Sequence, residues 1–188
     1  TYFQAAARKP MQREVYVVNK SGKMTCLSAH EGWNAASFSG DYKYFLNTWS
    51  DSNHPFVYTI YDNRGKEVRE VLNNKELEEK LQKYNNAGVE FFSFTTSEGV
   101  KLNGWMIKPS DFDANKYPVI MHQYSGPGSQ QVVDNWNVGS MGNGGMFDYY
   151  LAQKGYIVVT VDGRGTGARG ANFEKSIYMR LGDLESKD

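Results

Sequence analysis

The chain has few of the residues that build metal centres or disulfide frameworks. Its 188 residues include one cysteine, Cys26, and three histidines. One cysteine cannot form an intrachain disulfide and leaves a thiolate metal cluster without ligands, so we expect no metal and no cofactor. Basic and acidic residues balance at 21 each, which leaves no basic stripe to bind nucleic acid. The apolar runs are far shorter than the ~18–20 residues of a membrane-spanning helix, so we expect no membrane segment.

An initiator methionine and a signal-like segment are also missing. The chain begins at Thr1, and residues 1–4 already read as the middle of a strand. We therefore expect an internal piece of a longer parent protein. Apolar residues make up 40% of the chain and aromatic residues 14%, which is enough to form a buried core. This composition argues against disorder.

Residues 1–72 contain an internal repeat of short strands. Three pairs of landmarks recur at an offset of 42 or 43 residues: Tyr2-Phe3 with Tyr44-Phe45, Val15-Tyr16 with Val57-Tyr58, and Gly22-Lys23 with Gly65-Lys66. A period of roughly 40–50 residues built of short strands is typical of β-propeller blades. The repeat predicts about two incomplete blades at the C-terminal end of a propeller. Two unrelated hairpins of a sandwich are the alternative.

Residues 73–87 read as a helical linker. Asn74 can cap the helix, and Leu77, Leu81 and Tyr84 recur on one face.

The rest of the chain has the pattern of a second domain. Two strands, 89–96 and 101–108, are joined by a short polar turn and predict a hairpin. The runs 118–123 and 156–161 are nearly all apolar, as in strands buried on both faces, and a helix at 146–154 can connect them as a parallel pair. A hairpin followed by a parallel pair predicts the N-terminal part of an α/β-hydrolase domain.

Tyr124 follows the third predicted strand of this second domain, which spans residues 88–188. In open α/β sheets, ligands bind at the carboxyl ends of the strands, and the Ser-Gly-Pro-Gly run at 125–128 forces a sharp turn there. In α/β-hydrolases the loop after the third strand supplies an oxyanion-hole donor. A phenolic hydroxyl suits that task because it donates a hydrogen bond without carrying charge. Position alone does not distinguish this role from that of an ordinary strand-capping tyrosine.

Two motifs carry a resemblance to a known family. The run Tyr-Ser-Gly-Pro-Gly-Ser-Gln at 124–130 follows Tyr-Pro-Val-Ile, and Asp-Gly-Arg-Gly-Thr-Gly stands at 162–167. Together with the order propeller, linker, hydrolase, they resemble the prolyl oligopeptidase family of serine peptidases, and within it the exopeptidases that release N-terminal dipeptides with proline or alanine at the second position. The resemblance implies that Tyr124 is the oxyanion-hole donor. It also implies that the parent acts on peptides, forms a homodimer and is exported to a periplasm or cell surface.

The sequence contains no G-x-S-x-G nucleophile motif. The nearest match, at 138–142, has valine at the first glycine position and follows no predicted strand, so Ser140 is not expected to be a nucleophile. His122 comes too early in the chain for a triad histidine and is expected to be a packed or hydrogen-bonded strand residue. We therefore expect the chain to lack the Ser/Asp/His triad and to be inactive alone. A related oligopeptidase, an acylaminoacyl-peptidase and a non-enzymatic binding module remain alternatives.

Residues 165–170 match G-x-G-x-x-G literally. The glycines do not lie within a βαβ unit that ends in an acidic residue, as a dinucleotide site requires. We expect this loop to shape the rim of the catalytic cleft, with Asp162 and Arg164 as a structural ion pair.

Overall fold

The computed structural model describes residues 1–84, 87–113, 116–139 and 145–188. It divides into two compact units, which are described separately: residues 1–83 with 133–136, and residues 84–132 with 137–188.

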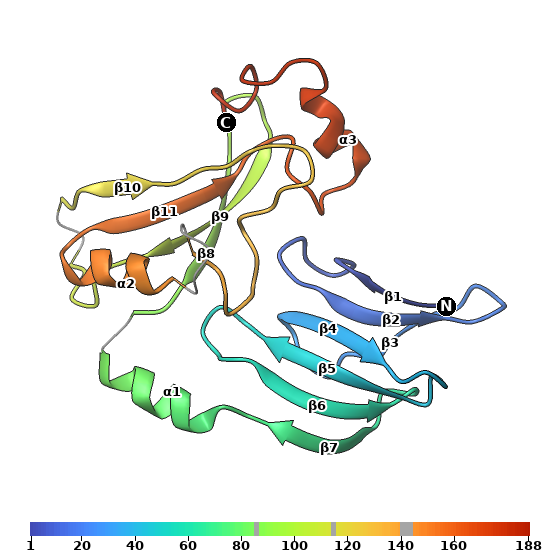
Figure 1. Cartoon of the computed structure of the whole chain (residues 1–188). Coiled ribbons are helices and arrows are strands. Elements are labelled where there is room, and N and C mark those ends of the chain that lie inside the picture. Colours follow the sequence, from blue (N-terminus) through green and yellow to red (C-terminus); the bar gives the residue numbers. More distant parts are fainter. Residues whose placement is uncertain (85–86, 114–115, 140–144) are drawn as a thin grey trace. The chain divides into compact units, whose positions relative to one another are not determined.

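The first unit contains two antiparallel sheets in which each strand pairs with the next along the chain (Figure 1). The first sheet comprises β1 (Tyr2–Ala5), β2 (Glu14–Val18) and β3 (Met24–Cys26); the second comprises β4 (Trp33–Phe38), β5 (Tyr44–Ser50), β6 (Val57–Asp62) and β7 (Glu67–Leu72). The repeated landmarks fall on equivalent elements, since β1 corresponds to β5 and β2 to β6. Gly22 and Gly65 occupy the two matching turns, both with positive φ, 82° and 83°. None of the sheets in the described ranges closes on itself, which is consistent with part of a propeller.

The core of the first unit lies between its two sheets. Val15, Leu27, Phe45 and Tyr61 form a buried cluster. Successive side chains of a strand point to opposite faces, so in a strand with one covered face they alternate between buried and exposed. Strand β5 shows this pattern, since Phe45 is 1% exposed and its neighbour Leu46 is 36% exposed.

Residues 133–136 return to the first unit and are held there by Asp134. Its Oδ2 accepts a hydrogen bond from Gln12 Nε2 at 2.9 Å, and its Oδ1 accepts one from the backbone N–H of Ser52 at 3.0 Å. The backbone N–H of Asp134 donates to the carbonyl of Met11 at 2.8 Å. The sequence gives no hint of this attachment, because its partners lie about 80 to 120 residues away.

Helix α1 (Lys75–Leu81) and the 3-10 turn η1 (Gln82–Tyr84) confirm the predicted helix. The proposed side-chain cap is wrong: Asn74 adopts a left-handed conformation, and its Nδ2 donates to the carbonyl of Phe56 at 2.7 Å instead. The predicted apolar face is also not buried, since Leu77 is 40% and Tyr84 63% exposed.

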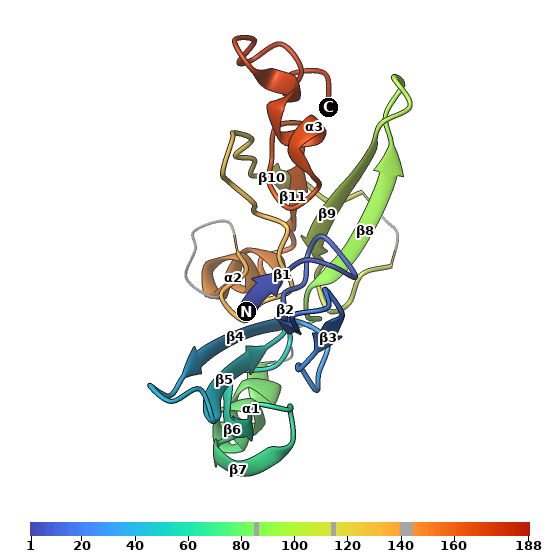
Figure 2. The same ribbon diagram turned by 90° about the vertical axis from the view of Figure 1, so that its right-hand side faces the viewer.

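The second unit is built on one mixed sheet with the strand order β10-β11-β9-β8 (Figure 2). Strands β8 (Glu90–Thr95) and β9 (Lys101–Ile107) form the predicted hairpin, and β10 (Val119–Met121) pairs in parallel with β11 (Ile157–Asp162). Helix α2 (Met146–Gln153) lies between them in sequence, as predicted. The short α3 (Ala171–Glu174) and the 3-10 turn η2 (Lys175–Ile177) follow.

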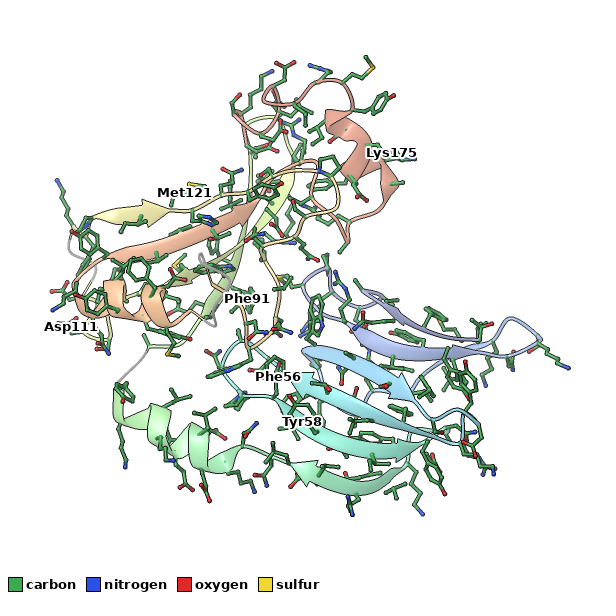
Figure 3. The ribbon with its side chains drawn as sticks, viewed as in Figure 1. Phe56, Tyr58, Phe91, Asp111, Met121 and Lys175 are labelled. Carbon is green, nitrogen blue, oxygen red and sulfur yellow. The ribbon has the colours of Figure 1, made fainter. Side chains whose placement is uncertain are left out.

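The two apolar runs of this sheet differ in burial. Strand β11 is central and mostly buried, as predicted. Strand β10, on which Figure 3 labels Met121, is not buried on both faces. Val119 is 59% and Met121 55% exposed. These alternate residues lie on one face of the strand, so that face is uncovered, and β10 is also the edge strand of the described sheet, with β11 as its partner. Within the described residues, every helix is too short or too polar to cross a bilayer.

Candidate active site

Tyr124 lies at the edge of the second unit's sheet where the two parallel strands end. The pairing of β10 with β11 extends one residue past the strand, because the backbone N–H of His122 donates to the carbonyl of Val159 at 2.9 Å. Tyr124 follows two residues later, and 62% of it is exposed. Tyr124 therefore lies at the carboxyl-terminal edge of the parallel pair, where the sequence placed it.

The segment after Tyr124 turns sharply for a reason visible in its residues. The backbone N–H of Ser129 donates to the carbonyl of Gly126 at 3.1 Å, which closes a four-residue turn. Pro127 occupies the second position and Gly128 the third with a φ of +76°, the arrangement of a type II turn. The Ser129 hydroxyl reinforces it by donating to the Gly126 carbonyl at 2.6 Å.

The loop beyond Tyr124 is tied to the segment that follows β11. The N–H of Gly128 donates to Glu174 Oε1 at 3.0 Å, and the N–H of Gly167 donates to the carbonyl of Ser129 at 2.8 Å. Further along, the N–H groups of Gln131 and Val132 donate to the carboxylate of Asp162 at 2.9 and 3.0 Å. These hydrogen bonds hold the loop at several positions between residues 128 and 132.

The predicted ion pair between Asp162 and Arg164 is wrong. Asp162 is 3% exposed, and burial raises the pKa of its carboxyl group, although its two backbone N–H donors oppose that rise. Strand β11 ends at Asp162 and the chain turns immediately afterwards. The guanidinium of Arg164 consequently meets Asp188 at 2.7 Å and Glu98 at 2.8 Å.

The glycine-rich loop at 165–170 makes close packing contacts. Gly165 has a φ of +99°, and a Cβ there would overlap Ile177 Cδ1 and lie 2.8 Å from its Cγ1. The Thr166 hydroxyl donates to the carbonyl of Gly163 at 2.8 Å. The glycine at 165 thus permits the fully buried Ile177 to approach the backbone.

Tyr124 lines an open pocket of about 620 Å³. Its walls come from the loop at 123–127 and from the C-terminal segment, which contributes Leu181 and Glu185. No group of three or more metal-ligating side chains gathers in the described part of the chain. Ser140 lies outside the described residues. His122 lies just past the end of β10 and is half-buried, and its buried Nδ1 atom has no hydrogen-bond partner among the described atoms.

Two family models match separate parts of the chain. The model for the N-terminal region of dipeptidyl peptidase IV matches residues 1–56, and the prolyl oligopeptidase family model matches residues 147–188. The chain is thus similar to dipeptidyl peptidase IV in its N-terminal part and to the prolyl oligopeptidase family in its C-terminal part. The resemblance read from the motifs at 124–130 and 162–167 is therefore confirmed.

Relatives in this family extend the match over the whole chain. The crystal structure of Porphyromonas gingivalis dipeptidyl peptidase 4 is 43% identical, with a TM-score of 0.90 over 98% of this chain and 26% of that one. A protein of Chaetomium globosum named probable dipeptidyl-aminopeptidase B is 37% identical over 193 residues, which cover 100% of this chain and 20% of the relative. Dipeptidyl peptidase 4 of Trichophyton rubrum is 33% identical over 196 residues, covering 100% of this chain and 24% of the relative. The chain thus spans about a quarter or less of the length of the family members it matches.

Proposed function

We propose that the chain is the part of a serine dipeptidyl peptidase in which a β-propeller ends and an α/β-hydrolase domain begins. Two successive antiparallel sheets in the first unit support the propeller part. The hairpin β8–β9 and the parallel pair β10–β11 in one sheet support the hydrolase part. The names of the related peptidases support the activity.

In this proposal Tyr124 donates a hydrogen bond to the oxyanion of the tetrahedral intermediate. The observation that carries it is the exposed phenol on the loop leaving the carboxyl end of β10, lining an open pocket. When a serine attacks a peptide carbonyl, the carbonyl oxygen gains negative charge. A neutral hydroxyl held there stabilises the charge as it develops, and needs no counter-charge in the ground state.

The test is Tyr124→Phe in the full-length enzyme that carries this sequence. Loss of one oxyanion donor lowers kcat about 10²–10³-fold in hydrolases of known mechanism, and we expect a fall of that size with little change in KM. Tyr150→Phe is the matched control, because Tyr150 is a 53% exposed tyrosine on α2 of the same unit. A Tyr124→Phe enzyme with the kcat of the parent would exclude the oxyanion role.

The substrate class has a separate test. We propose release of N-terminal dipeptides with proline or alanine at the second position, which requires recognition of a free amino group. A Gly-Pro chromogenic amide should be cleaved by the full-length enzyme, and its N-acetylated form should not. Cleavage of the acetylated form would favour an acylaminoacyl-peptidase or oligopeptidase. The 188-residue chain, which contains no G-x-S-x-G motif, should turn over neither compound.

The assembly and location of the parent rest on the family alone. We propose a homodimer, which light scattering of the full-length protein would test through its molar mass. We also propose export to a periplasm or cell surface, and fractionation of the source cells would contradict this if the protein stayed with the cytoplasmic fraction.

A further inference from the structure

The carboxylate of Asp162 is engaged by the loop that begins at Tyr124. Its Oδ1 accepts from the N–H of Gln131 at 2.9 Å and its Oδ2 from the N–H of Val132 at 3.0 Å. Asp162 is 3% exposed at the carboxyl end of β11. A carboxylate is costly to bury unless both of its oxygens are hydrogen-bonded. Here both oxygens accept from consecutive backbone groups of this loop, so Asp162 holds the far end of the loop against the sheet.

Gly163 supplies an independent contact at the near end of the same loop. A Cβ at Gly163 would lie 3.1 Å from Ser125 Oγ and 3.3 Å from Gln123 Nε2. These two side chains flank Tyr124 and are hydrogen-bonded to each other at 2.8 Å. The side chains on both sides of Tyr124 therefore lie close to Gly163, and a Cβ there would require them, and Asp188 Oδ2 at 3.3 Å, to shift by a few tenths of an ångström.

We propose that Asp162 and Gly163 position Tyr124 for catalysis: Asp162 anchors the far end of its loop, and Gly163 seats the near end. The inference rests on the proposed oxyanion role of Tyr124. The pair touches no reacting atom and acts through the loop. Placement matters because an oxyanion donor works only within hydrogen-bond distance of the oxygen that becomes charged. A misplacement of about 1 Å caused by a remote substitution can cost about 10²-fold in rate.

Asp162→Asn is the direct perturbation. A carboxamide has a similar shape, but one of its two terminal atoms donates instead of accepting, so one loop N–H would face another donor. Thr160→Val is the matched control. Thr160 is fully buried two residues earlier on β11, and its hydroxyl has no partner among the described atoms. The control thus removes a buried polar atom from the same strand without removing a hydrogen bond to the loop.

The experiment measures kcat and KM of the full-length enzyme on a Gly-Pro chromogenic amide, with Tyr124→Phe and the double variant in the same series. We expect Asp162→Asn to lower kcat about 10- to 100-fold, with KM within about threefold, since loop misplacement affects the transition state more than ground-state binding. Thr160→Val should keep the parent's kcat within about twofold. Once the phenol's hydroxyl is removed, its position no longer matters, so the double variant should be about as slow as Tyr124→Phe alone.

The outcomes separate the two proposals. If Tyr124→Phe retains the parent's kcat, the oxyanion role fails and this inference fails with it. If Tyr124→Phe is slow but Asp162→Asn retains the parent's kcat, or the two losses multiply in the double variant, only the positioning role fails. Should Asp162→Asn not fold, Gly163→Ala takes its place. Its new Cβ crowds Ser125 and Gln123. If the proposal is right, Gly163→Ala also lowers kcat, and combining it with Tyr124→Phe lowers kcat no further than Tyr124→Phe alone.

Discussion

Replacing Gly165 with alanine tests how the second unit holds the chain after β11. Two separate costs are expected at this position. The first is conformational, because Gly165 has a φ of +99°, and a left-handed backbone costs a residue with a Cβ about 1–2 kcal/mol. The second is steric, because the new Cβ would overlap Ile177 Cδ1 and lie 2.8 Å from Cγ1 and 3.2 Å from Cγ2.

The steric cost can be separated with a matched glycine. Ile177 is 1% exposed and has little room to move, and overpacking a core costs about 1–3 kcal/mol. Gly155 has a φ of +85° and nothing within 4 Å of its ideal Cβ, so Gly155→Ala carries the conformational cost alone. Both variants gain about 0.4–1 kcal/mol from a less flexible unfolded chain. Gly165→Ala should therefore be the more destabilising of the two by about 1–3 kcal/mol.

Urea unfolding of the 188-residue chain labelled with 5-fluorotryptophan is a suitable assay. The sequence has four tryptophans, and Trp105 is the one that lies in the second unit, so its ¹⁹F signal reports on that unit alone. Ile177→Ala supplies a further check, since it removes the atoms that the new Cβ would meet. In that background the extra cost of Gly165→Ala should disappear. Equal destabilisation by Gly165→Ala and Gly155→Ala would refute the packing assignment. So would an extra cost of Gly165→Ala that persists in the Ile177→Ala background.

Two further predictions concern the core and the pH dependence of stability. Phe45→Ala removes a 1% exposed ring from the core cluster of the first unit and should lower the free energy of unfolding by about 3–5 kcal/mol. Leu46→Ala, on the more exposed face of β5, should lower it much less. Equal unfolding midpoints of the two variants in urea would contradict the assigned faces. Burial raises the pKa of Tyr149 from 10.0 to about 12, so the native state keeps a proton that the unfolded state loses. The free energy of unfolding should then fall by about 2–3 kcal/mol between pH 10 and 12, and Tyr149→Phe should remove that part of the slope.

Features that depend on neighbouring residues were predictable. The glycine turns of the repeat, the hairpin β8–β9 and the turn at 126–129 all follow from side-chain alternation and from the φ preferences of glycine and proline. The same holds for the edge position of Tyr124, because a parallel pair brings its carboxyl ends together. The turns and the hairpin depend on residues close together in sequence, and the edge position of Tyr124 follows from the apolar strand pattern and the crossover rule for a parallel pair.

Features that depend on partners far away in the sequence were not predictable. Asp162 and Arg164 are two residues apart, and their opposite charges suggested a pair. In the fold, Asp162 meets backbone groups 30 and 31 residues away, and Arg164 meets Asp188, 24 residues away. An acidic residue at the end of a buried strand is the signal that could have pointed to a backbone-binding role, since a buried carboxylate must find donors.

The sequence by itself indicated the family resemblance, the order of the elements and the tyrosine at the sheet edge, because local backbone preferences and short motifs carry that information. Tertiary structure alone decided that β10 is an exposed edge strand, that residues 133–136 belong with the first unit, and that Asp162 accepts hydrogen bonds from the N–H groups of Gln131 and Val132. Those outcomes depend on which distant groups packing brings within about 3 Å of one another, and neighbouring residues do not specify that.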